Sequence, residues 1–374
     1  MAANPSAIAG GVVDSDKFKM VKVRGTWNWL AVIDEVLDRE KRDDGVQPVA
    51  KWVEALTVEL GTTASWCEAE AYSRARFFKA LSLFENLVSL TFVCVSQSEA
   101  SWKALVASGV APRLEAFHMI INDGAVAGPV SFANSHPLIV DLTLLSVWWT
   151  EPLERTTKIP PITLPHLEAL RAEACIVCAL GPAASLSRVQ IWWDDATGAE
   201  TALKNVALNA PNAAELVSIS GPWANGRNLV ECVAETLPGV SRLRFAREMP
   251  LKESLVYNWF EQEAVTDNVE VAAGLRVVQY DESADSASSL SDQRKLIVSW
   301  VEMTSGIQVI ILGRDTWKRW EVAATDSGDQ VWYRASVMVH NPDSDTYERV
   351  VPDLHNEVVD WYDFADKYAK SGRS

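Results

Sequence analysis

The only cysteine spacing in the sequence that could support metal or redox chemistry is Cys175-Ile-Val-Cys178. A structural zinc site needs four ligands, usually from two such pairs or from one pair and two histidines, and no second pair occurs. A redox pair normally opens a helix after a strand, whereas Gly181-Pro182 stops any long helix here. We therefore expect structural thiols and no metal site, with metal binding and redox chemistry as the alternatives.

Other catalytic patterns are missing from the sequence. The five histidines are scattered, and neither H-E-x-x-H nor G-x-S-x-G occurs. No glycine-rich phosphate loop is present, and the carboxylate pair Asp194-Asp195 lies in a stretch that is typical of a turn. We expect neither an enzyme nor a bound cofactor, although an active site assembled from distant residues would leave no such pattern.

Charge and composition narrow the range of partners. The chain has 374 residues, is 48% hydrophobic and has a formal net charge of -16. A chain this acidic repels phosphate backbones, so we expect no nucleic-acid or anionic-membrane partner. No apolar run is long enough for a membrane helix, and the first residues do not have the pattern of a signal peptide. With five cysteines, an odd number, these features favour a cytoplasmic or nuclear protein that is not secreted.

The elements that must position any site are indicated by an internal repeat. One pattern recurs about every 28 residues: an apolar residue, two others, an apolar residue, one other, and an apolar residue. We call these three apolar positions the first, second and third slots. Apolar residues fill 29 of the 30 slots, and Ser218 is the exception. The ten windows begin at Val53, Leu87, Leu114, Ile139, Leu167, Leu186, Ala213, Val240, Leu275 and Ile307.

Prolines and helical segments fit between these windows. Proline stands two places before the first slot in five windows, where it suits a short turn from helix to strand. Each expected helix has apolar residues three and four apart and comes shortly before a window. These helices are expected at 73–84, 101–109, 200–210, 228–237 and 293–303.

Strand, return helix and strand again is the pattern of an α/β leucine-rich-repeat solenoid, or horseshoe. Its parallel strands line the concave face and its helices lie outside. We expect an irregular solenoid of about ten laps over 51–314, after a tail and helical cap in 1–50. Residues 315–374 are expected to form an aromatic cap with a hairpin between 316–325 and 331–340. A doubly wound α/β domain is the alternative, but ten strands of one local pattern are many for one open sheet.

The phrases LPHLEALRAEAC (164–175), LNAPNAAELVSI (208–219) and LPGVSRLRF (237–245) resemble leucine-rich repeats of fungal, basidiomycete-type F-box proteins. The resemblance covers about 50–315. It implies a substrate-recognition surface on the repeats, and an N-terminal F-box in that family implies attachment to a ubiquitin ligase. Residues 1–50 depart from the F-box pattern, since they offer only one plausible helix, at 26–43.

Strand geometry identifies a candidate binding surface. Alternate residues of a strand face opposite sides, so residues between the slots are expected on the concave face. Several of them are arginines, whose planar fork suits the carboxylates of an acidic segment. The alternative is that these arginines pair with glutamates such as Glu215, Glu168 or Glu173. The candidate binding residues are Arg171, Arg188, Gln190, Trp192, Arg242 and Arg244.

We therefore expect a protein-protein interaction module that binds an unidentified protein partner through its concave face. The resemblance implies a substrate-receptor-like role. The alternatives are an enzyme or small-ligand protein of another class, and a structural scaffold in an oligomer. A closed pocket with convergent polar groups would favour the small-ligand alternative. An exposed apolar patch would favour the scaffold.

Overall fold

The structure is a computed structural model of the chain. It describes residues 19–24, 49–59, 80–93, 99–121, 126–146, 159–193, 199–219, 227–246, 277–281, 297, 307, 309–312, 315–320, 331–341 and 346–350. These residues belong to two compact units, Met1–Asn212 and Ala213–Ser374, which are described separately below.

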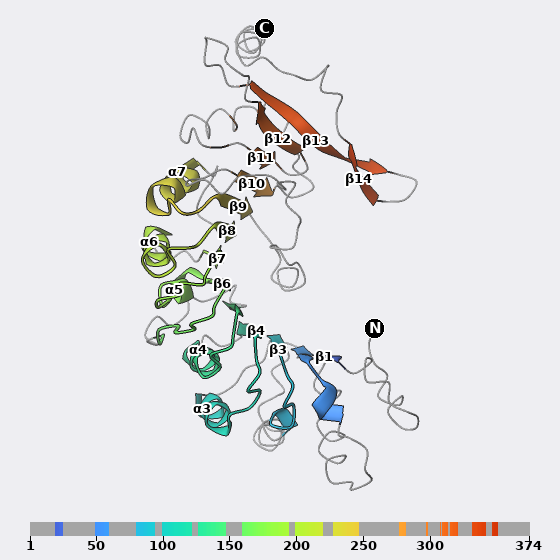
Figure 1. Cartoon of the computed structure of the whole chain (residues 1–374), viewed down its shortest axis with the longest axis vertical. Coiled ribbons are helices and arrows are strands. Elements are labelled where there is room, and N and C mark those ends of the chain that lie inside the picture. The colour runs from blue at the N-terminus through green and yellow to red at the C-terminus, as the bar shows by residue number, and fades with distance from the viewer. Residues whose placement is uncertain are drawn as a thin grey trace. The chain divides into compact units, whose positions relative to one another are not determined.

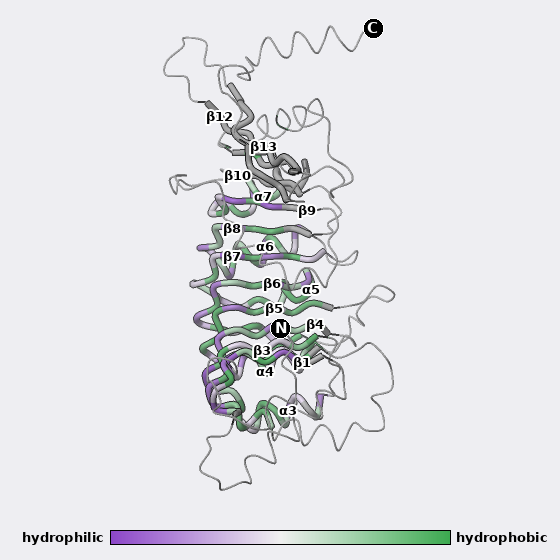
Figure 2. Tube along the Cα trace, turned by 90° about the vertical axis from the view of Figure 1, so that its right-hand side faces the viewer, coloured by the Kyte–Doolittle hydropathy of each residue, from purple (hydrophilic) through white to green (hydrophobic). Residues whose placement is uncertain are grey.

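The first unit is built on parallel strands that follow one another in chain order (Figure 1). Figure 2 shows several of them stacked side by side, with hydrophobic and hydrophilic residues alternating along them. The strands are β1 (Met20–Arg24), β2 (Ala55–Glu59), β3 (Ser89–Val93), β4 (Ala116–Ile121), β5 (Asp141–Ser146), β6 (Ala169–Glu173) and β7 (Arg188–Trp192).

The pairing of these strands confirms the repeat register. The second slots of successive windows are partners across the sheet, as Leu56 with Leu90 and Leu142 with Leu170 show. The row continues through Phe117 to Val189. An error of one residue would turn every apolar side chain to the other face of the sheet. The repeated pattern therefore corresponds to equivalent positions of successive strands.

The slots also form the core. In the windows of the first unit every slot residue is buried, including Ala172, the smallest of them. An apolar face of one lap is too small to exclude water alone, so stacking of the laps buries it. The buried slot residues of this unit are Val53, Leu56, Val58, Leu87, Leu90, Phe92, Leu114, Phe117, Met119, Ile139, Leu142, Leu144, Leu167, Leu170, Ala172, Leu186, Val189 and Ile191.

A turn precedes the strand in each of the five windows that carry a proline, as predicted, at β4, β5, β6, β8 (Glu215–Ile219) and β9 (Arg242–Ala246). In the window at Leu114 the Leu114 amide donates to the Ala111 carbonyl, 3.0 Å away, with Pro112 in the second position of the turn. Proline is favoured there because its fixed φ matches the turn. The residue after the first slot then links the laps. The Val88 carbonyl accepts bonds from the amides of Glu115 and Ala116, at 2.8 and 3.0 Å.

Helices return the chain between strands and lie on one side of the strands in this unit (Figure 1). They are α3 (Glu99–Ser108), α4 (Ala127–Asn134), the single-turn α5 (Ala174–Val177) and α6 (Ala199–Asn209). A 3-10 turn, η3 (Val49–Trp52), precedes β2. The helices expected at 101–109 and 200–210 are confirmed. Those expected at 26–43, 73–84 and 293–303 lie wholly or mostly outside the described residues.

Large aromatic side chains fill the space between α3, α4 and β4. Trp102 and Phe132 lie 5.6 Å apart between ring centroids, and Phe117 and Phe132 lie 5.1 Å apart. Gly128 of α4 makes room for them, since a Cβ there would lie 2.9 Å from Cβ of Trp102. His136 joins this cluster, and its Nε2 lies 2.7 Å from the Val110 carbonyl oxygen. Helix and strand are thus held together by a close-packed aromatic core.

The second unit continues the same pattern and then changes it. The strands β8 (Glu215–Ile219), β9 (Arg242–Ala246), β10 (Val277–Asp281) and β11 (Val309–Leu312) are parallel, with the helix α7 (Arg227–Thr236) between β8 and β9. After them β12 (Asp315–Trp320), β13 (Val331–Asn341) and β14 (Thr346–Val350) pair antiparallel. The hairpin predicted between 316–325 and 331–340 is confirmed by the pairing of β12 with β13.

One strand was not anticipated by the sequence analysis. The strand β1 lies within 1–50, ahead of the first predicted window, and pairs in parallel with β2. In the sequence Phe18, Val21 and Val23 fit the slot pattern. The Lys19 carbonyl accepts two lap-linking amide bonds, as that of Val88 does. The parallel strands therefore begin earlier than the expected boundary at residue 51.

Candidate functional site

A row of polar side chains runs across the strands of the first unit, on the face opposite the slots. It consists of the residues between the second and third slots, and we call it the polar row. Each member is the in-register partner of the next along the sheet. Its members are Lys22, Thr57, Thr91, His118, Thr143, Arg171 and Gln190.

Hydrogen bonds connect the middle of the polar row. His118 Nδ1 lies 2.8 Å from Thr143 Oγ1, and Arg171 donates to the same hydroxyl oxygen at 3.2 Å. Arg171 also forms an ion pair with Asp141, at 3.3 Å, on the neighbouring row. The arginine is thus held by an acidic residue of this chain, as the internal-pairing alternative predicted, although through Asp141 rather than Glu168 or Glu173.

This environment lowers the pKa of His118 below its ordinary value. Burial is the main cause, because desolvation disfavours the charged imidazolium. The carboxylate of Asp141 acts in the opposite direction and the guanidinium of Arg171 in the same direction. We expect a neutral His118 ring in the folded protein at neutral pH.

Burial along the polar row changes from one end to the other. Lys22 is exposed, and Thr57, Thr91 and His118 are half-buried. Thr143 is 1% exposed and Gln190 is fully buried. The expected open surface is therefore present at β1–β4, but the prediction is wrong at Gln190 and also at Trp192, which is 7% exposed.

The end of the polar row at β7 contains polar groups that are buried without a partner. Within the described residues, neither atom of the Gln190 amide makes a hydrogen bond, and the same holds for Nε1 of Trp192, two residues on. Leaving such a group unsatisfied costs about 1–3 kcal/mol. These two side chains of β7 have hydrogen-bonding capacity that the described part of the chain does not use.

The six predicted binding residues are divided between the two units. Arg171, Arg188, Gln190 and Trp192 lie on the adjacent strands β6 and β7 of the first unit. Arg242 and Arg244 lie on β9 of the second unit, where Arg242 and Glu215 are 3.8 Å apart and Arg244 is 1% exposed. The Arg242–Glu215 pair matches the internal-pairing alternative, and the expected exposure of Arg244 is wrong. A binding role for the six residues stays a prediction.

The C-x-x-C cysteines lie directly after β6, at its carboxyl end. Cys175 belongs to α5 and Cys178 follows it, and both side chains are half-buried. Cys175 Sγ lies 3.9 Å from a carboxylate oxygen of Glu173. In the described part of the chain no group of three or more metal-ligating side chains occurs. Among these same residues no helix is long and apolar enough to cross a membrane.

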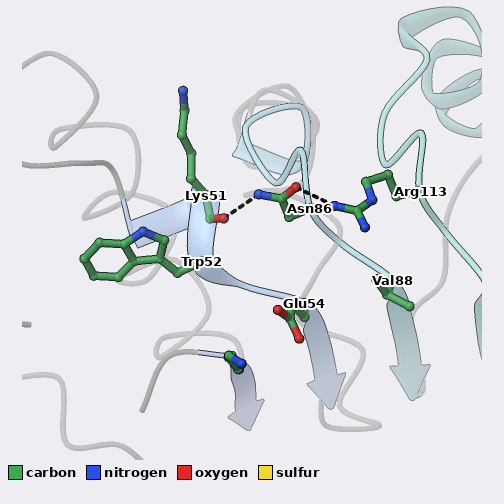
Figure 3. Close-up of a pocket in the computed structure, with 7 residues that line it drawn as sticks. Lys51, Trp52, Glu54, Asn86, Val88 and Arg113 are labelled. Carbon is green, nitrogen blue, oxygen red and sulfur yellow. Dashed lines mark hydrogen bonds between the residues drawn. The ribbon is translucent and has the colours of Figure 1, made fainter. Parts of the chain in front are cut away.

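The structure also shows a cleft that the sequence analysis missed. It has a volume of about 270 Å³ and lies at the amino-terminal end of the first strands. Its lining residues stand just before or after the first slots of successive windows, so aligning the windows and comparing those columns would have grouped them. They are Lys19, Lys51, Trp52, Glu54, Asn86, Val88 and Arg113, and we call this the entrance cleft (Figure 3).

Comparisons with known proteins do not assign a family. No family model matches the chain, and a search of curated proteins found no match. The solved structures that match include a structural-genomics target from Bacteroides fragilis, 12% identical, covering 75% of this chain and 68% of that chain with a TM-score of 0.38. This similarity assigns neither fold nor function, and the resemblance to fungal F-box-type repeats stays a prediction.

Proposed function

We propose that the chain is a protein-interaction module of the leucine-rich-repeat type, which binds a protein partner through the strand face that carries the polar row. The repeated laps and their shared register support this function. Such laps place equivalent residues at regular intervals and give an extended surface that suits recognition of another chain. A substrate-receptor-like role follows from the resemblance of the repeats.

The observation that carries the proposal is the exposure of the polar row at β1–β4. The slot residues of β2–β4 are buried there, whereas Lys22 is exposed and Thr57 and Thr91 are half-buried. On the neighbouring row of the same face, Met20 is 80% exposed, next to Ala55 and Ser89. Short side chains beside an exposed apolar one let a partner approach the sheet closely.

The binding surface proposed here, at β1–β4, differs from the arginine patch that the sequence predicted. Arg171 is held by Asp141 and Thr143, and the end of the row at β7 is buried. Arginines that already pair within the chain contribute less to a new interface, because binding must first break those pairs. We therefore assign first contact to β1–β4 and a secondary role to Arg171, Gln190 and Trp192.

Photo-cross-linking from both sides of the first unit tests the proposal. A benzophenone amino acid at Thr91 or Thr57 is expected to capture one partner in the native cell. The same probe at Ala107, an exposed position on α3, is not. With that partner purified, Thr91→Arg is expected to weaken binding about tenfold or more, because a bulky side chain blocks close approach. Unchanged binding of Thr91→Arg, or capture only from Ala107, contradicts the proposal.

A further inference from the structure

The entrance cleft has a chemistry unlike the rest of this acidic chain. Three cationic residues line it, Lys19, Lys51 and Arg113, against one carboxylate, Glu54. A cluster of cations in a concave site raises the local concentration of anions. The formal charge of the whole chain is -16, so the excess of positive charge in this cleft is a local feature.

Three backbone carbonyl groups of the cleft already have hydrogen-bond partners. The carbonyl groups of Lys19, Glu54 and Val88 each accept two amide bonds from the next lap. Because each of these oxygens already accepts two bonds, an N–H group of a ligand needs a side-chain acceptor in this part of the cleft. The side chains drawn in Figure 3 belong to successive laps and line one cleft, with Asn86 between Lys51 and Arg113 and with the Lys51 side chain pointing away from Glu54.

Arg113 is positioned by a neutral partner. Its Nη1 donates to Oδ1 of Asn86 at 3.0 Å, and the amide nitrogen of Asn86 donates to the Lys51 carbonyl at 2.7 Å (Figure 3). In the part of the chain that the structure describes, no carboxylate lies within ion-pair distance of Arg113. The guanidinium is thus oriented but keeps its charge and several donors for a ligand, and its planar fork suits a carboxylate.

The remaining walls define the rest of the ligand. Trp52 is half-buried and presents an indole surface, and Val88 adds an apolar side chain. Glu54 is exposed, and its carboxylate repels multiply charged anions but is able to accept a hydrogen bond from an N–H group of a ligand. Lys51 Nζ lies 4.0 Å from a carboxylate oxygen of Glu85. Because Glu85 already offsets its charge, Lys51 attracts an anionic ligand less strongly than Arg113 does.

We propose that the entrance cleft binds a small carboxylate that carries an N–H donor and an apolar side group, as found in an N-acylated amino acid or at the carboxyl terminus of a peptide. The carboxylate contacts Arg113, the apolar group lies against Trp52 and Val88, and the N–H donates to Glu54. This site is separate from the strand face of the proposed function and does not depend on it.

Calorimetric titration of the full chain tests the ligand class. The probe is N-acetyl-L-phenylalanine, and its matched control is N-acetyl-L-phenylalaninamide, in which an uncharged NH2 group replaces one carboxylate oxygen. We expect the acid to bind with a dissociation constant of about 1 mM or lower and the amide at least about tenfold more weakly. The proposal is overturned if both bind equally, or if no heat of binding is seen with the acid up to about 10 mM.

Variants locate the binding to the cleft. Arg113→Gln is expected to weaken binding of the acid about tenfold, and Arg113→Lys less, because lysine keeps the charge without the fork. Glu54→Gln is expected to lower the affinity for N-acetyl-L-phenylalanine relative to that for 3-phenylpropionate, which has no N–H, because the change weakens the N–H contact while it relieves repulsion of both carboxylates. Lys103→Gln, on the exposed side of α3, is the control and should change neither. The proposed site is contradicted if Arg113→Gln and Lys103→Gln change the affinity for N-acetyl-L-phenylalanine equally while the thermal melting of both variants is unchanged.

A peptide pair distinguishes the two sources of the ligand. A tetrapeptide ending in phenylalanine is titrated with a free or an amidated carboxyl terminus. Tighter binding of the free peptide than of N-acetyl-L-phenylalanine supports a peptide terminus as the ligand. Equal affinity supports a small carboxylate. Equal binding of free and amidated peptides overturns the proposal, because the carboxylate would then contribute nothing.

Discussion

His118 Nδ1 and Thr143 Oγ1 lie 2.8 Å apart on neighbouring parallel strands, and both side chains belong to the polar row. The two residues are 25 positions apart in the sequence, about one lap of the repeat. Arg171, one strand further, donates to the same threonine oxygen. The repeat thus connects three polar side chains from three laps through one hydroxyl group.

This contact predicts a pH dependence of stability. Burial holds the pKa of His118 below its ordinary value of about 6.5, so the unfolded chain binds more protons there than the folded chain. The free energy of unfolding is therefore expected to fall as the pH is lowered from about 7.5 through 6.5 toward the lowered pKa. Denaturant melts of the protein and of His118→Gln across this range measure the contribution.

The control for the histidine prediction is His166→Gln, because His166 is exposed in a turn. We expect His166→Gln to keep the pH dependence of the native chain and His118→Gln to reduce it. If both variants lose as much stability on acidification as the native chain does, the pH dependence comes from other groups of this acidic chain. A rise in stability on acidification that His118→Gln removes would mean that the pKa of His118 is raised rather than lowered.

The core slots give a second prediction. Leu170 and Leu243 are fully buried second-slot residues in the first and second units. Truncation of either to alanine is expected to lower the free energy of unfolding by about 2–5 kcal/mol, because it removes buried methyl groups and leaves a cavity. Leu208→Ala on α6 is the matched control, since Leu208 is 79% exposed, and should change it by less than about 0.5 kcal/mol. Losses below about 1 kcal/mol for both core variants would contradict the repeat register.

The packing of α3 against α4 gives a third prediction. A Cβ added at Gly128 would collide with the indole and Cβ of Trp102, which is 2% exposed and cannot swing into solvent. Gly128→Ala is therefore expected to destabilise the protein by about 1–3 kcal/mol, despite the higher helix propensity of alanine. Ala104→Ser, at an exposed position of α3, is the control. A stabilised Gly128→Ala variant in thermal melts would contradict this packing.

The repeated backbone was predictable because its cause is local and periodic. Slot positions follow from strand alternation and prolines from turn geometry, and both are visible in single windows such as the one at Leu114. The strand β1 was not predicted from the sequence. Phe18, Val21 and Val23 are separated by lysines and a methionine, and they lie far from the next window. The antiparallel hairpin was visible because a polar turn separates two stretches rich in tryptophan and β-branched residues.

The side chains between the slots were harder to predict, because strand alternation gives the face of a residue but not what covers that face. Gln190 and Thr91 occupy equivalent positions, yet the first is fully buried and the second is half-buried. The pairing of Arg171 with Asp141 also depends on which residue the neighbouring lap presents. The entrance cleft depends on turns from several laps, so no single window reveals it.

Arg244 gives the last prediction, and it reverses what the strand pattern implied. That pattern places Arg244 on an exposed face, where a change to glutamate would cost less than about 0.5 kcal/mol. The structure leaves only 1% of the residue exposed, so Arg244→Glu puts an anion where the fold has buried a cation. Removing one charge from a buried ionic environment costs about 3–5 kcal/mol. We expect Arg244→Glu to lower the free energy of unfolding by a comparable amount in denaturant melts. Glu235→Lys on α7 is the control of opposite sign at an exposed position and should cost less than about 0.5 kcal/mol. If Arg244→Glu melts like Glu235→Lys, Arg244 is exposed in solution and returns to the set of surface residues that a partner can contact.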